Sequence, residues 1–247
     1  MVPEGYKLVF EDDFNGNTLD LDKWEYRALG KRRCGFNGKS QVSVENGNLV
    51  MRQKYFDGEY GLGWYGGMIK AKPRFCRGYF EIRCICSEHH HPRSFWSAFW
   101  FQGTHPYEAE LSRGGIGSAE IDIIEAVSNM GGLAGVESNI HVAGMKKPPL
   151  HGHPTDHPPV FRKNIPDCYT AYHTYALEWT DKVYRFFVDG ELFAETSWGD
   201  GVSTEDEELI VSLELPEVMD NPLDQETAFI VDYVRVYQDE KGVMVNP

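Results

Sequence analysis

The chain has 247 residues, of which 41% are hydrophobic and 25% are charged, and its formal net charge is −14 at pH 7. This charge disfavours nucleic acid and anionic membranes as partners, and no stretch approaches the ~20 apolar residues that a membrane span requires. A chain of this length can bury the core of one large β domain, and no linker or repeat divides it. We therefore expect residues 1–247 to form a single domain.

The chain carries five cysteines, and they show neither a disulfide framework nor the spacing of a zinc site. The first residues lack the basic region and the apolar core of a signal peptide. The compartment stays open: the protein is cytoplasmic, or it is secreted or periplasmic and has lost its signal.

The N-terminal part is expected to alternate strands with long loops. Tyr6–Phe10 is predicted to be a strand, and Trp24–Gln41, with its glycines and five basic residues, a long loop. Val42–Val44 and Leu49–Met51 alternate around Asn46-Gly47, which is a strong hairpin signal.

Tyr55–Gly67 is rich in glycine and aromatic residues and predicts a binding loop that presents Trp64. The alternative is a surface loop with its rings folded beneath it. Gly78–Cys86 alternates cleanly and predicts a strand with one face in the core.

The segment Phe95–Phe101 is aromatic on both faces of a predicted strand. Trp96 and Trp100 share one side, and the phenylalanines share the other. One set would lie in the core, and the tryptophans would line a concave surface, where their rings can stack on sugars. The alternative is that both faces are buried.

The next strand, Ala119–Ala126, places three carboxylates in an apolar run. Residues two apart share a face of a strand, so Glu120 and Asp122 point the same way. Glu125 is out of phase with them. A β-bulge at Ile123-Ile124 would return it to the same face.

The rest of the chain continues the strand pattern, and no window holds a sustained helical period. The turn Asp189-Gly190 and the loop Met145–Pro166 separate further strands, predicted at Gly135–Val142, Ala171–Trp179, Val183–Val188, Leu192–Thr196, Leu209–Leu215 and Phe229–Tyr237. Many short strands with regular turns predict an all-β sandwich or jelly roll, in which the first and last strands can pair.

Two carboxylates flanking a glycosidic bond are what glycoside hydrolysis needs. A third acid between them would keep their pKa values apart, because crowded negative charges resist joint ionisation. The alternative is a solvated strand face with acids at alternate positions. The alternation alone does not decide between the two, but the neighbouring sequence does.

The acid motif Glu120–Glu125 resembles the signature of glycoside hydrolase family 16, in the variant with an extra bulge residue that laminarinases and agarases carry. Six further segments resemble landmarks of that family, in the expected order and over nearly the whole chain. They are Leu8–Gly16, Glu45–Val50, Phe95–Trp100, Tyr172–Trp179, Phe187–Gly190 and Val231–Tyr237. The resemblance implies a concanavalin A-like β-sandwich jelly roll with a concave substrate cleft.

The resemblance also implies the roles of the acids. Glu120 would be the nucleophile, and Glu125 the general acid and then the general base. Asp122 would hydrogen-bond to Glu120 and help hold the proton on Glu125. The retaining mechanism asks for carboxyl groups roughly 5–5.5 Å apart, so the strand must curve.

Further residues match positions that contact substrate in the family. Trp96, Trp100 and His141 would lie near the cleaved bond, although His141 could equally be a structural histidine in a polar pocket. Asn37 would contact sugars on the non-reducing side. We expect a polysaccharide to be the only partner of a monomeric enzyme that needs no cofactor for catalysis.

Family members often hold a structural calcium ion between the chain ends, and Asp13, Gly47 and Asp232 match its ligand positions. Oxygen ligands suit Ca²⁺. Here an aspartate, Asp13, replaces the usual glutamate.

Three departures from the family pattern concern the substrate. The run Val211–Leu215 departs from the usual glycine-rich end of that strand. Met68 stands where glucan-cleaving members carry arginine, and Lys39 stands where a glutamate is usual after Asn37. We expect hydrolysis of a β-1,3- or mixed β-1,3-1,4-glucan, as the net charge disfavours a highly sulfated polymer unless the cleft itself is basic. Met68 keeps open an endo-acting enzyme on an algal or host galactan, and a non-catalytic glycan-binding module is a further alternative.

Overall fold

The computed structural model describes residues 2–88, 94–103, 118–126, 134–141, 160–197, 202–219, 223–240 and 243–245. Within these ranges the chain forms twenty β-strands and one 3-10 turn, Lys39–Gln41. None of the described helical structure is long and apolar enough to span a bilayer. The all-β prediction is confirmed.

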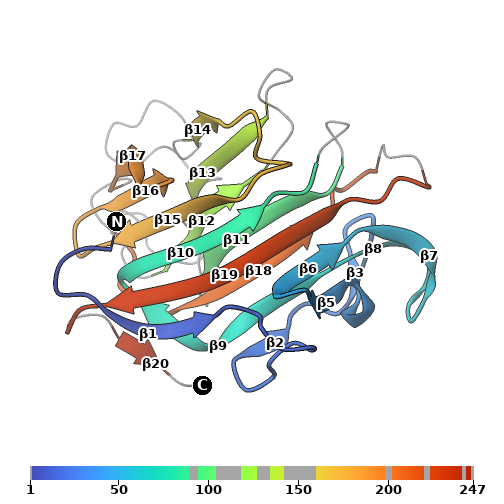
Figure 1. Cartoon of the computed structure of the whole chain (residues 1–247), viewed down its shortest axis with the longest axis horizontal. Coiled ribbons are helices and arrows are strands. Elements are labelled where there is room, and N and C mark those ends of the chain that lie inside the picture. Colours follow the sequence, from blue (N-terminus) through green and yellow to red (C-terminus); the bar gives the residue numbers. More distant parts are fainter. Residues whose placement is uncertain are drawn as a thin grey trace.

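Two large antiparallel sheets form the body of the molecule (Figure 1). Sheet A runs through β17 (Glu191–Thr196), β16 (Tyr184–Val188), β15 (His173–Trp179), β10 (Gly78–Ile85), β19 (Ala228–Gln238), β6 (Asn48–Arg52) and β5 (Val42–Glu45), and β1 (Lys7–Asp12) also pairs with β19. The predicted pairing of the first strand with the C-terminal Phe229–Tyr237 strand is therefore confirmed.

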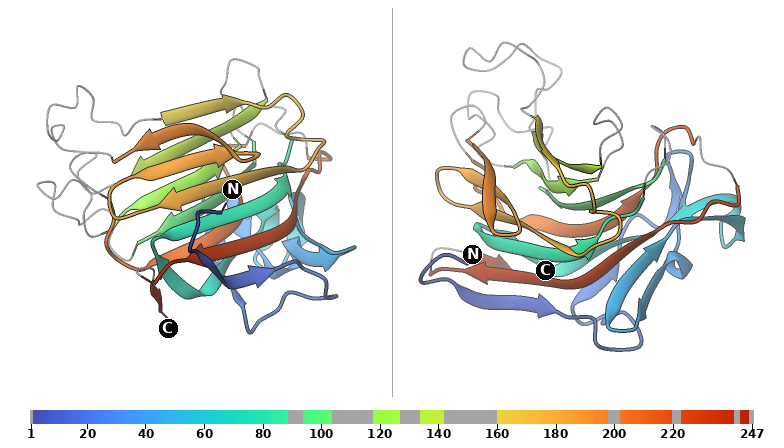
Figure 2. Two further views of the ribbon diagram at one scale, coloured as in Figure 1. Left: turned by 60° about the vertical axis from the view of Figure 1, so that its left-hand side comes forward. Right: turned by 45° about the horizontal axis from the view of Figure 1, so that its top comes forward.

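Sheet B stacks against sheet A as a second curved layer (Figure 2). It runs through β14 (Val160–Asn164), β13 (Gly135–His141), β12 (Glu120–Glu125), β11 (Trp96–Gln102), β18 (Glu207–Glu214), β9 (Met68–Cys76) and β2 (Trp24–Tyr26), and β20 (Val243–Val245) pairs with β9. The acid strand and the tryptophan-rich strand are thus neighbours at the centre of one sheet.

The core fills the space between the sheets. Phe99 and Phe101 of β11 are fully buried there, as the alternation predicts. The Phe101 ring meets Phe80 of β10 edge-on at 4.7 Å and Trp179 of β15 at 5.7 Å. Edge-to-face aromatic pairs add to the burial energy of the rings. Since the phenylalanines of β11 face the core, its tryptophans face the other side of sheet B.

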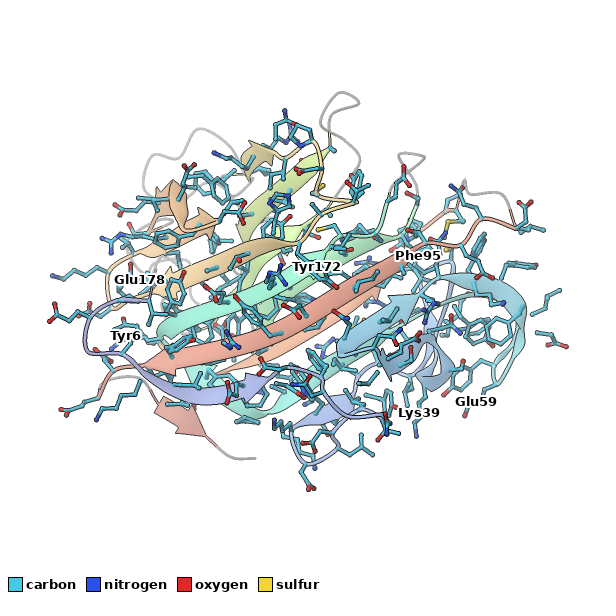
Figure 3. The ribbon with its side chains drawn as sticks, in the orientation of Figure 1. Tyr6, Lys39, Glu59, Phe95, Tyr172 and Glu178 are labelled. Carbon is cyan, nitrogen blue, oxygen red and sulfur yellow. The ribbon has the colours of Figure 1, made fainter. Side chains whose placement is uncertain are left out.

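The outward face of sheet A carries charged and aromatic side chains (Figure 3). Arg83 lies 4.4 Å over the ring of Tyr172, and Arg185 donates a hydrogen bond of 2.9 Å to Glu178. Sheet A thus closes the core and presents ion pairs to solvent, while the predicted acids lie on the far face of sheet B.

A third, four-stranded sheet corrects two loop predictions. Its strands are β3 (Gly30–Arg32), β4 (Gly35–Asn37), β8 (Gly61–Gly66) and β7 (Lys54–Gly58), in that order. The glycines that suggested loops instead permit close packing. A Cβ at Gly35 would lie 2.2 Å from the carbonyl oxygen of Trp64, and a Cβ at Gly63 would lie 2.9 Å from the Phe36 ring.

Other predictions hold, with one exception. The Asn46-Gly47 and Asp189-Gly190 turns have positive φ at both residues, as two-residue hairpins require. The predicted loop Met145–Pro166 contains the edge strand β14, and its residues 145–159 lie outside the described ranges.

Candidate active site

A β-bulge interrupts the acid strand where the sequence predicts it. Along β13, Asp122 pairs with Asn139 and Glu125 pairs with Glu137, so three steps on β12 match two on its neighbour. Ile123 and Ile124 are both buried. The Ser138 hydroxyl donates a 2.6 Å hydrogen bond to the carbonyl oxygen of Ile123, satisfying a backbone acceptor inside the bulge. The bulge returns Glu125 to the face of Glu120 and Asp122.

The acids lie in rows across sheet B, because directly paired residues of neighbouring strands share a face. Glu120 pairs with Gln102 on β11 and with His141 on β13, and Gln102 pairs with Glu208 on β18. In a parallel row, Asp122 lies between Trp100 and Asn139. The site is therefore built on adjacent strands of sheet B.

A groove of about 300 Å³ opens over these rows. It is lined by the three acids, the two tryptophans of β11 and a set of further polar and basic side chains. Its lining residues are Arg27, Arg32, Arg33, Trp96, Ala98, Trp100, Gln102, Glu120, Asp122, Glu125 and Glu214. The predicted concave site thus exists, and the three acids share it.

Glu125 has the environment of a general acid. Trp96 Nε1 donates to its Oε1 at 2.9 Å, and Asn139 Nδ2 donates to its Oε2 at 3.0 Å. Burial and then the charge of Asp122 raise the pKa of Glu125 to about 8, against the effect of the Trp96 hydrogen bond. A carboxyl group with this pKa carries its proton at neutral pH and can give it to a leaving group.

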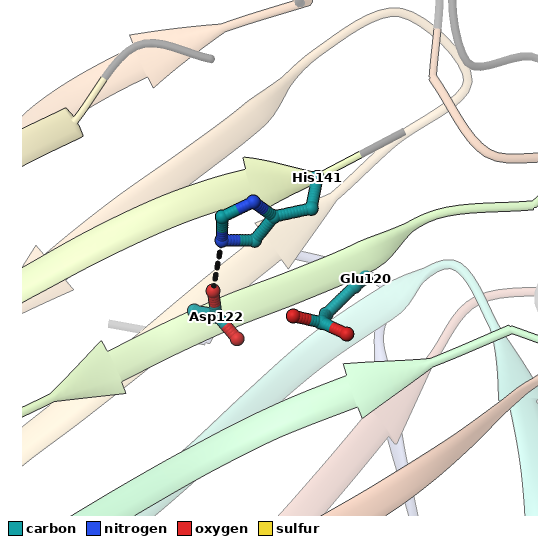
Figure 4. Close-up of side chains that lie close together, drawn as sticks. All are labelled: Glu120, Asp122 and His141. Atoms are coloured by element: carbon teal, nitrogen blue, oxygen red, sulfur yellow. Dashed lines mark ion pairs between the residues drawn. The ribbon is translucent and has the colours of Figure 1, made fainter. Parts of the chain in front are cut away.

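His141 lies on β13, which flanks the acid strand β12 on the side opposite to β11 and its two tryptophans. Its Nε2 is 3.0 Å from Asp122 Oδ2 (Figure 4). Burial lowers the pKa of His141, but the Asp122 hydrogen bond and the charges of Asp122 and Glu120 outweigh it and raise that pKa to about 9. A protonated imidazole thus holds the middle acid in place.

Glu120, Asp122 and His141 bring their ligand atoms within 4.8 Å of one another. Among the described residues they are the one such group that could hold a metal ion. The imidazole already pairs with Asp122, and its raised pKa keeps it protonated at neutral pH.

The predicted sugar-stacking tryptophans each have an arginine over the ring. Arg33 lies 5.0 Å from the centroid of Trp96, and Arg27 lies 5.4 Å from that of Trp100. Trp100 is only 7% exposed, and its Nε1 donates to Ser212 at 3.0 Å. Both line the groove, with little of Trp100 left for a sugar. Stacking on substrate stays a prediction.

Trp64 and Asn37, like His141, are predicted substrate residues that are not among the residues lining the groove. Trp64 is 5% exposed and packs edge-on against Phe95 at 5.8 Å and Tyr55 at 5.5 Å. This corrects the prediction for Trp64, whose glycine-rich surroundings form a core strand instead of a binding loop. Asn37 is 1% exposed, and its amide has no hydrogen-bond partner among the described residues. Its role as a sugar contact stays a prediction.

The predicted calcium ligands do not fit a calcium ion as they stand. The Asp13 carboxylate accepts a 2.9 Å hydrogen bond from Arg235, and that of Asp232 accepts one of 2.5 Å from Arg83. Gly47 lies in the turn between β5 and β6. Two guanidinium groups on the two carboxylates oppose a cation there.

Sequence reasoning missed several polar residues of the site, among them Gln102, Asn139 and Arg27. The first two could have been found, since Gln102 is in phase with Trp96 and Trp100, and Asn139 is in phase with His141. Arg27 follows β2 in a segment predicted to be a loop, and no local pattern places it over β11.

Comparison with known proteins agrees with this geometry. The family model "Beta-porphyranase A-D, GH16 domain" matches residues 8–239. The chain is 27% identical to beta-porphyranase E of Zobellia galactanivorans over 212 residues, covering 76% of this chain and 69% of that protein. It is 25% identical to a beta-glucanase of Rhodothermus marinus over 265 residues, covering 94% and 85%.

The fold is also that of solved structures. The laminarinase from Rhodothermus marinus superposes with a TM-score of 0.75 at 23% identity, over 94% of this chain and 97% of that one. The extent of the family match, from the first strand to the end of β19, shows that the chain belongs to glycoside hydrolase family 16, in the group described as the GH16 domain of beta-porphyranases A–D.

Proposed function

We propose that the protein is a retaining, endo-acting glycoside hydrolase that cleaves internal β-linkages of a polysaccharide by double displacement. The observation that carries this proposal is the bulge at Ile123-Ile124. It places Glu125, with a pKa of about 8, beside Glu120 and Asp122 in one groove.

In the first step a carboxylate oxygen of Glu120 attacks the anomeric carbon while Glu125 gives its proton to the departing glycosidic oxygen. A covalent glycosyl-enzyme forms, and the fragment carrying the new hydroxyl group leaves. In the second step Glu125 takes a proton from water, and the water oxygen displaces Glu120 from the anomeric carbon with restored β configuration.

The charges in the groove support this change of role. The charge of Glu120 is among the causes that raise the pKa of Glu125. When Glu120 becomes an ester, that charge is gone, so the pKa of Glu125 falls and the carboxylate can act as a base. The Asp122 carboxyl group, 3.0 Å from His141 Nε2, stays beside Glu125 in both steps.

A β-1,3- or mixed β-1,3-1,4-glucan is the first candidate substrate. Its support comes from relatives with the same fold, among them the beta-glucanase and the laminarinase of Rhodothermus marinus.

A galactan is the second candidate, and specific observations favour it. The matching family model and one relative are porphyranases. Three arginines, Arg27, Arg32 and Arg33, line the groove of a protein whose net charge is −14. Guanidinium groups suit anionic substituents on a sugar.

The test is hydrolysis of a panel of purified polysaccharides, comprising laminarin, lichenan, agarose and porphyran, with new reducing ends and product sizes measured. The wild type should release oligosaccharides of several lengths from at least one of them. Glu120→Ser should lose this activity and keep its melting temperature, whereas the exposed acid variant Glu191→Ser should retain it. Binding without new reducing ends would support a glycan-binding module and contradict the proposal.

A further inference from the structure

Two residues of neighbouring strands, Glu208 and Gln102, lie in one row with the proposed nucleophile Glu120. Glu208 of β18 pairs with Gln102 of β11, and Gln102 pairs with Glu120 of β12. The fourth partner, Arg27, follows β2 and reaches over β9 into the same groove. All four side chains are joined by hydrogen bonds.

The hydrogen bonds run in one direction from Arg27 to Glu120. Arg27 Nε donates to Glu208 Oε2 at 3.1 Å, and Arg27 Nη2 donates to Gln102 Oε1. Gln102 Nε2 then donates to Glu120 Oε2 at 3.1 Å. Because a guanidinium group has donors only, it fixes which end of the Gln102 amide faces it. The NH₂ group is thereby aimed at Glu120.

Arg27 is itself held on several sides. Its backbone N–H donates to the carbonyl oxygen of Met68 at 3.0 Å, and Nη1 lies 3.4 Å from the Met68 sulfur. Its partner Glu208 also accepts from Lys70 at 2.7 Å. Burial raises the pKa of Glu208, but the Lys70 and Arg27 hydrogen bonds outweigh this and lower it, so Glu208 anchors Arg27 as a carboxylate.

We propose that Arg27 and Gln102 are positioning residues that orient the nucleophile Glu120. This inference rests on the proposed function. Gln102 holds Glu120 from β11, while His141 lies beside it on β13. A hydrogen-bond donor to a carboxylate favours its ionised form, which is the attacking form. Arg27 reaches Glu120 only through Gln102, so its effect on kcat should vanish when Gln102 is gone.

The experiment is a double-mutant cycle of Arg27→Leu, Gln102→Leu and the double variant, each checked for folding by its melting temperature. Gln102→Leu should lower kcat by about 10- to 100-fold with little change in KM, the worth of one hydrogen bond to a charged group. Arg27→Leu should have a smaller effect, and the double variant should match Gln102→Leu. Arg52→Leu, which removes a surface ion pair with Glu45, is the matched control.

A second measurement does not depend on turnover. The side-chain carboxyl of Glu120 is titrated by carbon-13 NMR, with its resonance assigned by its loss in Glu120→Gln. The midpoint should move to higher pH in Gln102→Leu and stay unchanged in Arg52→Leu. Replacement by glutamate, Gln102→Glu, should move it further, since a second carboxyl then opposes ionisation.

Three outcomes overturn the proposal. One is an unchanged Glu120 titration in Gln102→Leu. Another is a loss of kcat that is additive between Arg27→Leu and Gln102→Leu. The third is a wild-type protein that releases no reducing ends from any polysaccharide, which removes the proposed function itself and is recognised by the inactivity of the wild type, not of the variants.

Discussion

The protonation of one side chain, Glu125, determines whether the groove can do acid catalysis. Two N–H donors, from Trp96 and Asn139, favour its carboxylate, but burial and the charge of Asp122 prevail and raise its pKa to about 8. The surroundings therefore keep a proton on a group that, in water, would have lost it well below neutral pH.

These opposing effects on the pKa of Glu125 predict how activity falls at alkaline pH. Glu125 must be protonated to act as the acid, so kcat/KM should fall as pH rises through about 8. Trp96→Phe removes the donor that favours the ionised form, so this fall should move to higher pH. The measurement is kcat/KM against pH, and Trp64→Phe, a buried tryptophan outside the groove, is the control. A fall at the same pH in Trp96→Phe would contradict the assignment.

At the scale of the residue, the sequence was sufficient to predict that the three acids share one face. It was not sufficient to predict which side chains surround them. The period of two and the doubled isoleucine predicted Glu120, Asp122 and Glu125 on one face. Trp64 was misjudged because its exposure depends on packing against Phe95, which lies far along the chain. Arg27 was missed because its contact with Gln102 spans 75 positions.

At the scale of the element, the bulge is the feature on which the site depends. The Ser138 hydroxyl, donating to the Ile123 carbonyl at 2.6 Å, holds it from the neighbouring strand. Strand register is strongly specified here because both bulge isoleucines are buried. The bulge could be predicted from the sequence because the alternation of acidic and apolar residues shifts by one position between Asp122 and Glu125.

Ser138→Ala should therefore destabilise the fold by about 1–3 kcal/mol, the cost of leaving a buried acceptor unsatisfied. It should also lower kcat, since the bulge would lose the contact that fixes Glu125 relative to Glu120. Chemical denaturation and steady-state kinetics measure the two effects. The control is Ser43→Ala, a partly exposed serine of β5. Unchanged stability and kcat in Ser138→Ala would show that the bulge needs no such support.

The third sheet shows where prediction from pattern fails. Its strands are three to six residues long, and Gly35 and Gly63 lie where a Cβ would meet a neighbouring backbone or ring. Glycine is expected in loops and also wherever two segments approach closely. Only the packing of β4 against β8 distinguishes these two uses, and that is a tertiary property.

At the scale of the whole molecule, a carboxyl group buried between the sheets links stability to pH. Glu207 is fully buried, and its Oε1 accepts from the Ser203 hydroxyl and, at 2.9 Å, from the N–H of Ala119, the residue before Glu120. Burial raises the pKa of Glu207 to about 8 in spite of these donors. The folded protein thus binds a proton that the unfolded chain releases near the ordinary glutamate pKa of 4.5.

With a folded pKa above the unfolded one, the stabilisation is complete below about 4.5 and is lost as pH rises through about 8. Glu207→Gln keeps an acceptor for Ala119 and does not titrate. The free energy of unfolding should therefore fall less between acidic and alkaline pH in Glu207→Gln than in the wild type. Denaturant unfolding at several pH values measures this, with Glu191→Gln as the exposed control. Parallel pH profiles for the wild type and Glu207→Gln would contradict the link.

The dependence of KM on ionic strength should distinguish the two candidate substrates. A net charge of −14 surrounds a groove that three arginines line, although two of these already pair with Glu214 and one with Glu208. For an anionic galactan, KM should rise with ionic strength because salt screens its attraction to the arginines. For a neutral glucan, KM should stay nearly constant. KM measured from low to high salt on each substrate, with Arg33→Leu beside the wild type, distinguishes them.

The most direct test of the double displacement is the anomeric configuration of the first product, followed by proton NMR during early hydrolysis. Glu120 and Glu125, brought to one face by the bulge, predict that the β-anomer appears first and that the α-anomer follows only through mutarotation. An α-anomer formed first would mean that water attacks the sugar directly, and it would contradict the covalent role of Glu120.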